Sequence, residues 1–500
     1  MIDVAGQSAV VLGLGQSGLA MARALVEGGA TVRVADTRPE PPMLAALRAE
    51  LPQVPFNGGQ FESALLDGAT LLALSPGLSP THSAAAPLVG AAKKAGLDIV
   101  GEIELFARAL AGLKASRDYA PRLIGITGTN GKTTTARLAG LLIERAGRSV
   151  AVAGNISPTA LDALRERLHE RRLPDTWVLE LSSFQLATTR SLVCDAATVL
   201  NITQDHLDWH GSFDAYVKAK GRIFSSRTVQ VLNRDDPVVA AMAKKSSSVV
   251  TFRLQPPTQA DEYGLLTDSG ITWLAYAEDL AHGHRRRRPE GEQEVASEQL
   301  FVHRLMPADA LAIRGRHNAG NALAALALAR SIGCPLAPML HALRTYGGEP
   351  HRVQLIATVG GVQYYDDSKG TNVGATVAAL DGLAAEGLRL VVILGGDGKG
   401  QDFTPLAAPL ARAARAVVLI GRDASLVEQA IGANGAPYPI LHAESLPEAV
   451  DIAAGKAGEG DAVLLSPACA SLDMFRDYLQ RAEVFAEAVH ERALQAGQPC

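Results

Sequence analysis

Short apolar runs alternate with alanine-rich stretches along most of this 500-residue chain. In the first segment the apolar runs lie at 9–12, 31–35 and 70–74, and residues 19–27 have the composition of a helix. Such alternation predicts parallel strands joined by crossover helices, because parallel strands cannot be joined by tight turns. The first segment is therefore predicted to be a Rossmann-like α/β domain.

Two further series of apolar runs continue the pattern, each run being followed by a turn or a helical stretch. The strands predicted for them are 123–127, 149–153, 177–181 and 197–202 in the second series, and 361–365, 390–394, 416–420 and 462–466 in the third. Small and turn-forming residues interrupt the pattern near Gly101 and at 347–350, where we place the joints. The sequence predicts an α/β protein with three domains: 1–100, 101–348 and 349–500.

A glycine-rich segment at 125–135 lies between a predicted strand and the helical stretch 136–146. Backbone N–H groups of such a turn and the positive end of the following helix bind phosphates, Lys132 adds a positive charge, and the Thr133 hydroxyl can bind Mg²⁺. The general pattern would place its first glycine at Ile126, so the spacing indicates a particular subclass. The central domain is predicted to be of the P-loop ATPase type.

A second glycine motif, Gly13 to Gly18, follows the first predicted strand, and Asp36 ends the second. This spacing matches the dinucleotide fingerprint with its ribose-binding acid, and taken alone it indicates an NAD-dependent enzyme. The same turn would bind any nucleoside diphosphate, or its glycines could serve only close packing of strand against helix. Beside an ATP motif, it favours an ATP-dependent enzyme acting on a nucleotide-linked substrate.

Polar residues follow two strands of the second series. Glu180 ends the apolar run 177–179, at the carboxyl end of a strand, where open α/β sheets build their sites. It suits a Mg²⁺ ligand, although a strand-end carboxylate could also simply reach solvent. The stretch from Asn201 to His210, which includes His206, places further potential ligands after the next strand.

Composition mainly excludes classes of protein. With 47% hydrophobic and 20% charged residues the chain is globular, and a net charge of −5 gives no overall attraction to nucleic acid or anionic membranes. The cysteines are far apart and form no C-x-x-C pair, which favours a reducing compartment over disulfides or zinc; they are Cys194, Cys334, Cys469 and Cys500. Without a signal-like start or a spanning apolar run, we expect a soluble cytoplasmic protein.

Residues 282–294 stand apart, because a block of histidine and arginine meets a block of acidic residues. This segment could contact phosphate, lipid or nucleic acid. Adjoining opposite charges without interleaved aromatic residues favour a solvated, mobile loop instead.

Motifs in the second and third segments together resemble the Mur ligases of peptidoglycan synthesis. In the second they are G-T-N-G-K-T-T at 128–134, E-L-S-S-F-Q-L at 180–186, N-I-T-Q-D-H-L-D at 201–208 and H-N-A-G-N-A-L-A-A at 317–325. The third resembles the family members that add D-glutamate to UDP-N-acetylmuramoyl-L-alanine, through D-D-S-K-G-T-N at 366–372, G-G-D-G-K-G at 395–400 and S-P-A-C-A-S-L-D at 466–473. The resemblance covers essentially the whole chain.

The resemblance implies an ATP-dependent ligase that phosphorylates the carboxylate of UDP-N-acetylmuramoyl-L-alanine and passes the acyl phosphate to the amine of D-glutamate, releasing ADP and phosphate. The motif at 13–18 then binds uridine diphosphate rather than NAD. We also expect a monomer whose third domain moves as the site closes, with no nucleic-acid partner and no stable insertion into a membrane.

The resemblance further implies two Mg²⁺ ions, held by Thr133, Glu180, His206 and a carbamylated Lys220. An ammonium about 5 Å from Mg²⁺ would be repelled by roughly 7 kcal/mol at an effective dielectric near 20, whereas a carbamate would be attracted. Without the resemblance, Lys220 would be interpreted as a solvent-facing helix lysine. Lys132, Glu180, His206 and Lys220 are the expected catalytic residues.

By the same resemblance the site residues form three groups. The ATP group contains Gly128, Thr129, Asn130, Gly131, Lys132, Thr133, Thr134, Asn321, Arg352, Asp367 and Lys369. The UDP-substrate group contains Gln16, Ser17, Asp36, Thr37, Arg38, Ser75, Pro76, Gly77 and Asn155. The D-glutamate group contains Thr371, Lys399, Ser471, Leu472 and Tyr478, the last at a position where the family often has Phe.

Several alternatives stay open. Asp36 and Arg38 could pair with each other at a strand end, and His317 and Asn318 could support the local fold instead of the nucleotide. The segment 154–157 departs from the family's usual ending in glycine, which leaves its backbone geometry open. A second hypothesis is another Mur ligase or a folylpolyglutamate-synthase-like enzyme, and a third is a nucleotide-binding regulatory or redox protein.

Overall fold

The computed structural model describes residues 2–244, 247–279, 300–313, 315–433 and 435–498. The charged segment at 282–294 and Cys500 lie outside these residues, whereas Cys194, Cys334 and Cys469 are free and buried. The chain forms two compact units. The first comprises Met1–Ile202, His206–Ala310 and Gly320–Arg344, and the second Thr203–Asp205, Leu311–Ala319 and Thr345–Cys500.

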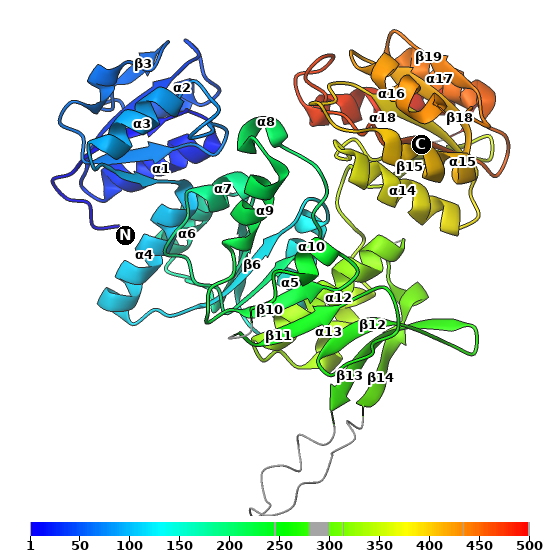
Figure 1. Ribbon diagram of the computed structural model, residues 1–500, viewed down its shortest axis with the longest axis horizontal. Coiled ribbons are helices and arrows are strands. Elements are labelled where there is room, and N and C mark those ends of the chain that lie inside the picture. Colours follow the sequence, from blue (N-terminus) through cyan, green and yellow to red (C-terminus); the bar gives the residue numbers. More distant parts are fainter. Residues whose placement is uncertain (1, 245–246, 280–299, 314, 434, 499–500) are drawn as a thin grey trace, which may run out of the picture. The chain divides into compact units, whose positions relative to one another are not determined.

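The first unit begins with a five-stranded parallel sheet, coloured in shades of blue in Figure 1. Its strands are β1 Ser8–Leu12, β2 Thr31–Asp36, β3 Phe56–Gly58, β4 Leu71–Leu74 and β5 Asp98–Val100, in the order β3-β2-β1-β4-β5. Its helices are α1 Gln16–Glu27, α2 Leu44–Glu50 and α3 Ala86–Lys94. Ala9 and Val11 belong to one apolar core, whereas Val10 and Leu12 belong to a second one with Leu88 of α3. The sheet is therefore buried on both faces, as a parallel sheet requires, and the Rossmann-like prediction is confirmed.

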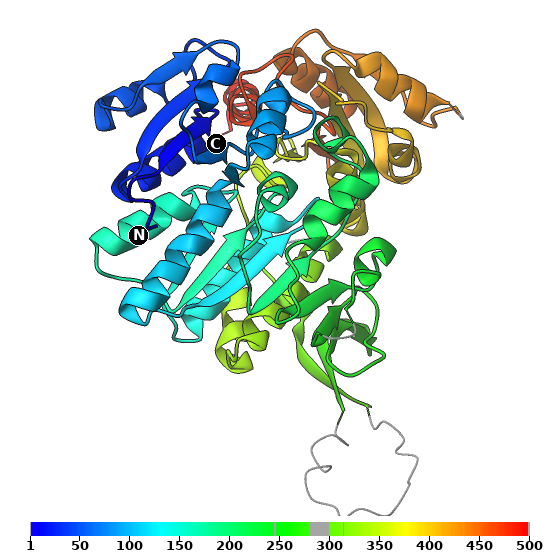
Figure 2. The ribbon, with the colours of Figure 1, turned by 60° about the vertical axis from the view of Figure 1, so that its left-hand side comes forward.

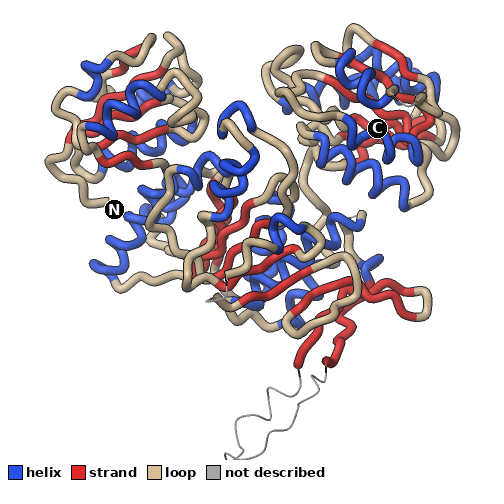
Figure 3. Tube along the Cα trace, viewed as in Figure 1, coloured by secondary structure: helices blue, strands red, loops and turns tan. Residues whose placement is uncertain are grey.

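A nine-stranded sheet forms the rest of the first unit (Figure 2). Its strands are β6 Arg122–Thr127, β7 Val150–Gly154, β8 Thr176–Glu180, β9 Ala196–Val199, β10 Val229–Asn233, β11 Val249–Phe252, β12 Glu262–Asp268, β13 Ile271–Asp279 and β14 Leu300–Pro307. They lie in the order β14-β13-β12-β11-β10-β9-β6-β8-β7. The four predicted strands pair in parallel, but β12, β13 and β14 form an antiparallel extension that the sequence analysis did not predict (Figure 3).

Helices follow the parallel strands of this central sheet. They are α4 Glu102–Arg117, α5 Lys132–Arg145, α6 Ala160–His169, α7 Ser183–Ala187, α8 Leu207–His210, α9 Phe213–Gly221, α10 Pro237–Ala240, α12 Arg316–Ser331 and α13 Leu336–Leu343. Helix α4 leads from the first sheet to the central one, and ion pairs of α1 with α6, Arg23 with Asp162 and Glu27 with Arg165, join the two parts. The motifs that begin at Gly128 and Asn201 follow the carboxyl ends of β6 and β9.

The second unit contains a six-stranded sheet, coloured yellow to red in Figure 1. Its strands are β15 Gln354–Val359, β16 Val362–Asp366, β17 Leu390–Gly395, β18 Ala414–Ile420, β19 Ile440–His442 and β20 Ala462–Leu465, in the order β15-β16-β20-β17-β18-β19. Its helices are α14 Val373–Ala385, α15 Ala407–Ala413, α16 Ala424–Gly432, α17 Leu446–Lys456 and α18 Tyr478–Gln495. Alternate residues of β17 pack into two different cores, so helices cover both faces; only β15 is antiparallel to its neighbour. The predicted parallel strands are confirmed.

Among the residues that the structure describes, no helix combines the length and the apolar character needed to cross a membrane.

Candidate functional site

The segment after β6 forms a tight loop that leads into α5. Gly128 and Gly131 have φ angles of 151° and 83°, which L side chains rarely adopt. A Cβ at Gly131 would lie 2.4 Å from Oδ1 of Asn321, so Asn321 packs directly against the loop. Gly125 instead lies inside β6, where a Cβ would approach the sulfur of Cys194 to 2.8 Å. Gly125 therefore serves core packing, and the anion-binding turn begins at Gly128.

Asn201, which follows β9, holds this loop in place. The backbone N–H groups of Thr129 and Asn130 donate to the carbonyl oxygen and the Oδ1 of Asn201, both at 2.8 Å. The Asn201 amide returns a hydrogen bond of 3.1 Å to the carbonyl of Asn130. Asn201 thus supports the loop, a role that its place in the motif at 201–208 did not indicate.

Two lysine ammonium groups donate to the same carbonyl oxygen of the loop. Lys132 Nζ lies 3.0 Å from the oxygen of Gly128 and 2.7 Å from that of Thr129. Lys220 Nζ lies 2.8 Å from the oxygen of Gly128 and 4.7 Å from the ring centre of Tyr216. The Lys220 side chain is only 2% exposed, so the interpretation as a solvent-facing lysine is wrong. Carbonyl dipoles and an aromatic face stabilise this buried cation.

Glu180 lies at the carboxyl end of β8 and is 2% exposed. Its Oε1 accepts a hydrogen bond of 3.1 Å from Asn155 Nδ2, whereas its buried Oε2 has no hydrogen-bond partner among the described residues. Gly154 fits beside this strand because a Cβ there would lie 2.3 Å from the carbonyl oxygen of Glu180. The idea that Glu180 merely reaches solvent is therefore wrong, and its unpaired oxygen calls for a ligand.

A Mg²⁺ ion fits this edge of the sheet. The unpaired Glu180 oxygen and the buried hydroxyl of Thr133, in the first turn of α5, are the oxygen donors that this cation prefers. Within the described part of the chain, no group of three or more His, Cys, Asp or Glu side chains is arranged to hold a metal.

His206 lies beside a cluster of rings. It has a φ of 56°, precedes α8, and its ring centre lies 4.6 Å from that of Phe184. His210, one helical turn further, has Nε2 3.0 Å from the hydroxyl of Ser183. Burial, followed by the charges of His206 and Lys220, lowers the pKa of His210 to about 4. His210 is thus a neutral hydrogen-bonding group near pH 7.

The glycines at 13–18 divide into two kinds. A Cβ at Gly13 would lie 2.8 Å from Cβ of Ser75, and a Cβ at Gly18 would lie 1.9 Å from the carbonyl oxygen of Gly13. Nothing lies within 4 Å of a Cβ at Gly15, the residue that precedes α1. Gly13 and Gly18 therefore serve strand-helix packing, whereas Gly15 leaves room for a ligand to approach the backbone.

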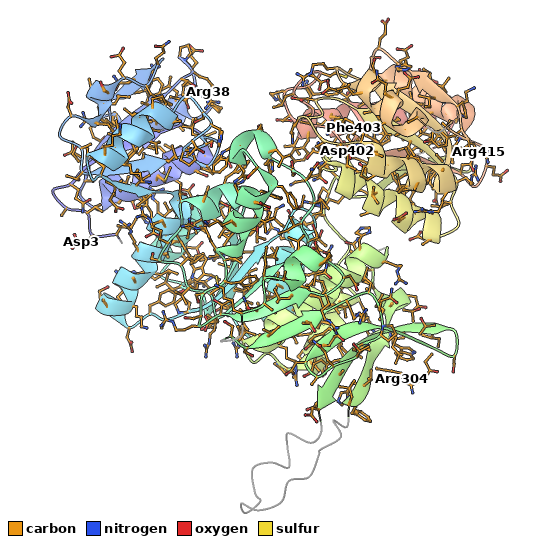
Figure 4. All side chains as sticks on the ribbon, in the orientation of Figure 1. Asp3, Arg38, Arg304, Asp402, Phe403 and Arg415 are labelled. Atoms are coloured by element: carbon orange, nitrogen blue, oxygen red, sulfur yellow. The ribbon has the colours of Figure 1, made fainter. Side chains whose placement is uncertain are left out.

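Asp36 pairs with Arg38, as the alternative interpretation stated. Asp36 Oδ1 accepts from the backbone and the Nε of Arg38, each at 2.9 Å, and Oδ2 accepts from the Leu14 N–H at 2.7 Å. Burial alone would raise the pKa of Asp36, but these hydrogen bonds lower it below its usual range. The Arg38 side chain remains 52% exposed at the edge of its domain (Figure 4).

The other residues assigned to the UDP substrate follow parallel strands of the first unit. Gln16 and Ser17 begin α1, after β1, and Thr37 follows β2. Residues 75–77 follow β4, where the carbonyl of Pro76 accepts a hydrogen bond of 3.1 Å from Trp209. Asn155 follows β7 of the central sheet. Its N–H donates to the Glu180 carbonyl at 2.7 Å, so the backbone of 154–157 is fixed at that point.

In the second unit, Asp367 and Lys369 follow β16. Burial raises the pKa of Asp367 to about 7, although a 2.6 Å hydrogen bond from the Ser466 hydroxyl and the charge of Arg352 both act to lower it. Such a carboxyl group is typical of a functional site. The Lys369 ammonium lies 4.9 Å from the ring centre of Tyr478, at the start of α18, which brings one residue of the ATP group and one of the D-glutamate group together.

The remaining D-glutamate residues follow neighbouring strands of this unit. Thr371 precedes α14 and Lys399 follows β17, whereas Ser471 and Leu472 follow β20. Ser471 is buried, but Leu472 is 70% exposed. His317 also belongs to this unit, where burial, followed by the charge of Arg352, lowers its pKa to about 4.

Comparison with known proteins identifies the three parts of the chain. A Mur ligase MurD-like N-terminal domain matches residues 7–101, a Mur ligase middle domain matches 126–329, and a Mur ligase, glutamate ligase domain matches 351–469. Together the three matches cover most of the chain.

Two relatives cover almost the whole chain, and both are named UDP-N-acetylmuramoylalanine--D-glutamate ligase. The protein of Ralstonia nicotianae (strain ATCC BAA-1114 / GMI1000) is 57% identical over 99% of both chains. That of Burkholderia mallei (strain SAVP1) is 58% identical over 98% of this chain and 97% of its own. The solved MurF ligase from Thermotoga maritima in complex with ADP has the same fold, with a TM-score of 0.57, 15% identity and coverage of 98% and 96% of the two chains. The chain belongs to the Mur ligase family.

Proposed function

We propose that this protein joins D-glutamate to UDP-N-acetylmuramoyl-L-alanine with hydrolysis of ATP to ADP and phosphate, in the synthesis of peptidoglycan precursors. The full-length identity of 57% to a relative of that name supports this choice of substrates. The observation that carries the chemistry is the loop after β6, which holds the Lys132 ammonium against the carbonyl oxygens of Gly128 and Thr129, next to the buried Glu180 carboxylate with its unpaired oxygen. A positive charge beside an oxygen ligand for Mg²⁺ suits the transfer of a phosphoryl group.

Amide formation from a free carboxylate is unfavourable in water, so the carboxylate of the UDP substrate must first be activated. The γ-phosphoryl group passes from ATP to this carboxylate, and the bond from phosphorus to the ADP oxygen breaks. The D-glutamate amine then attacks the acyl carbon, phosphate leaves, and the amine loses a proton. Transfer through a loose transition state requires positioned cations more than covalent help from the protein.

The loop after β6 and the side chains of Glu180, His206 and Lys220 have separate tasks in this scheme. The Thr129 and Asn130 N–H groups hold the loop through Asn201, and the backbone from Gly131 to Thr133, at the start of α5, would bind the phosphates. Lys132 would turn from its carbonyl contacts toward the β- and γ-phosphates. Glu180 and Thr133 would hold Mg²⁺, with His206 and Lys220 at a second ion. When bound, these ions neutralise charge on the phosphates.

We propose that Lys220 works as its carbamate. Its burial supports the proposal, because the side chain is fixed beside the loop rather than free in solvent. Addition of CO₂ to the neutral amine releases a proton and gives an anion, which would hold a cation that an ammonium would repel.

The domain boundaries 1–100, 101–348 and 349–500 are also proposals, supported by the ranges of the three matching domains. The first domain would bind the uridine diphosphate through Gly15 and the strand-end residues, and the third would bind D-glutamate. We further propose a cytoplasmic monomer whose third domain moves on closure. Light scattering tests the monomer, and X-ray scattering with and without substrates tests the movement.

Release of ADP with defined substrates tests the proposed function. ATP, UDP-N-acetylmuramoyl-L-alanine and D-glutamate should give ADP, whereas L-glutamate, meso-diaminopimelate and a folate in matched reactions should not. ADP release only with one of these controls would overturn the assignment and favour another ligase. Tight NADH binding that UDP does not compete away would favour the redox alternative.

A further inference from the structure

Three loops at the carboxyl ends of β17, β18 and β20 interlock in the second unit. They are residues 395–400, 421–423 and 468–473. A Cβ at Gly396 would lie 2.3 Å from the carbonyl oxygen of Ala470, and a Cβ at Gly421 would lie 2.8 Å from Cα of Gly396. The backbones therefore touch, and a change in one loop is transmitted to the others.

Arg422 is a cation that pairs with acidic residues of these loops while its side chain remains 60% exposed. Its guanidinium forms an ion pair with Asp397, and its Nε lies 3.5 Å from Asp423 Oδ1. Its backbone N–H donates to Asp473 Oδ2 at 2.9 Å. Asp423 Oδ2 in turn accepts the Gly398 N–H at 2.7 Å. One arginine thus contacts acidic residues from all three loops.

Lys399 lies next to this network in an unusual conformation. Its φ is 51°, and its backbone N–H donates to Asp397 Oδ1 at 3.0 Å. Residues in this region of φ are strained and are retained where a site needs them. Within the described residues, the Lys399 ammonium has no hydrogen bond or ion pair, although Asp397 is two positions away.

The Asp397 carboxylate is the natural competitor for the Lys399 ammonium. Arg422 occupies Asp397 Oδ1 from the next strand-end loop. Loss of the Arg422 charge would remove the cation that pairs with Asp397, and the Asp397 carboxylate would then attract the ammonium of Lys399, two residues along the chain. Lys399 would then bind Asp397 instead of a carboxylate from solution.

We propose that Arg422 is a positioning residue for the amino-acid substrate: by pairing with Asp397 it keeps the Lys399 ammonium available for a D-glutamate carboxylate. The inference rests on the proposed function. The bridge between Asp397 and Ala470 extends the effect to Ser471, because their backbones exchange hydrogen bonds of 3.0 and 2.8 Å.

Steady-state kinetics of three variants tests this inference. Arg422→Gln should raise KM for D-glutamate roughly tenfold, a typical effect of losing one charge-assisted contact, while KM for ATP and for the UDP substrate stays within about twofold. Asp397→Asn keeps an oxygen for the Lys399 N–H and removes the competing charge. The double variant that combines Arg422→Gln with Asp397→Asn should therefore have a KM for D-glutamate close to that of the original protein. Arg412→Gln, which breaks the exposed ion pair with Asp381, is the matched control and should change nothing.

The double variant separates charge competition from loss of structure. If Arg422 only stabilised the loops, the double variant would be at least as impaired as Arg422→Gln, and this result would overturn the inference. An unchanged KM for D-glutamate in Arg422→Gln, with the thermal transition retained, would also overturn it. Failure of the unsubstituted protein to use D-glutamate would instead overturn the proposed function, so the two failures are distinguishable.

Discussion

Replacement of Glu102 by Gln should stabilise the protein at high pH and leave its stability nearly unchanged at low pH. Glu102 lies in the first turn of α4 and is 1% exposed. Its Oε1 accepts the Leu161 N–H at 2.8 Å, and its Oε2 lies 3.5 Å from Nε2 of Gln185. Burial raises its pKa from 4.5 to about 7, with a further rise from the charge of Asp162, because hydrogen bonds from Leu161, Ala160 and Gln185 compensate only part of the desolvation.

The size and sign of the effect follow from this pKa. A carboxyl group that ionises less readily in the folded state than in the unfolded state lowers the free energy of unfolding once it is ionised. The cost is absent below the pKa of the unfolded chain, grows as the pH rises through 4.5 to 7, and is complete above the folded pKa. The difference corresponds to about 3 kcal/mol. Gln keeps an oxygen for Leu161 and carries no charge, so it removes the cost.

Urea unfolding followed by tryptophan fluorescence measures the difference. All three tryptophans lie between residues 177 and 273, and Trp177 is fully buried, so the signal reports the central domain. Glu102→Gln should exceed the original protein by up to about 3 kcal/mol at pH 8 and by less than about 1 kcal/mol at pH 5. Glu144→Gln, an exposed position on α5, is the control. A difference that does not depend on pH, or a less stable variant at pH 8, would refute the reasoning.

Three further predictions concern residues of the candidate site and of the glycine motif at 13–18. Glu180→Gln should lower turnover at least about 100-fold, measured as ADP release, without loss of thermal stability, because its Oε2 has no protein partner to lose. Lys220→Ala should be inactive and partly restored by a short-chain carboxylic acid; no restoration would contradict the carbamate. Gly18→Ala should destabilise the protein by roughly 1–3 kcal/mol, since its Cβ would meet a carbonyl oxygen. Gly15→Ala should leave stability unchanged and raise KM for the UDP substrate roughly tenfold. An equal loss of stability in the two glycine variants would contradict the assignment of Gly18 to packing and of Gly15 to ligand binding.

Most of the longer parallel strands could be predicted because strands buried on both faces appear as apolar runs between helices. The parallel strands β10 and β11 were missed, as was the antiparallel edge strand β15. The short edge strands β3, β5 and β19 were missed, since three residues give too little pattern. Strands β12 to β14 were also missed. β12 and β13 contain apolar stretches, but no helical stretch separates them, so the alternation of apolar runs with helices does not reveal them; the residues of β14 are mostly half-buried or exposed. They are held by pairing with their neighbours, which is not visible in local sequence.

The candidate site was predictable where chemistry lies directly after a strand. Glu180 and the loop at Gly128 are examples, because the carboxyl ends of parallel strands share one edge. Lys220 was not predictable from spacing alone: it lies on α9, far along the chain from the carbonyl of Gly128 that it contacts. Arg422 was missed for the same reason, since its partners come from other loops.

The fate of a labelled carboxylate oxygen tests the central claim most directly. UDP-N-acetylmuramoyl-L-alanine carrying heavy oxygen in its carboxylate would be incubated with the protein, ATP and D-glutamate, and the phosphate analysed by mass spectrometry. If the carboxylate is phosphorylated and D-glutamate displaces phosphate, one labelled oxygen appears in each phosphate released with the product. Product formation with unlabelled phosphate would contradict activation through an acyl phosphate.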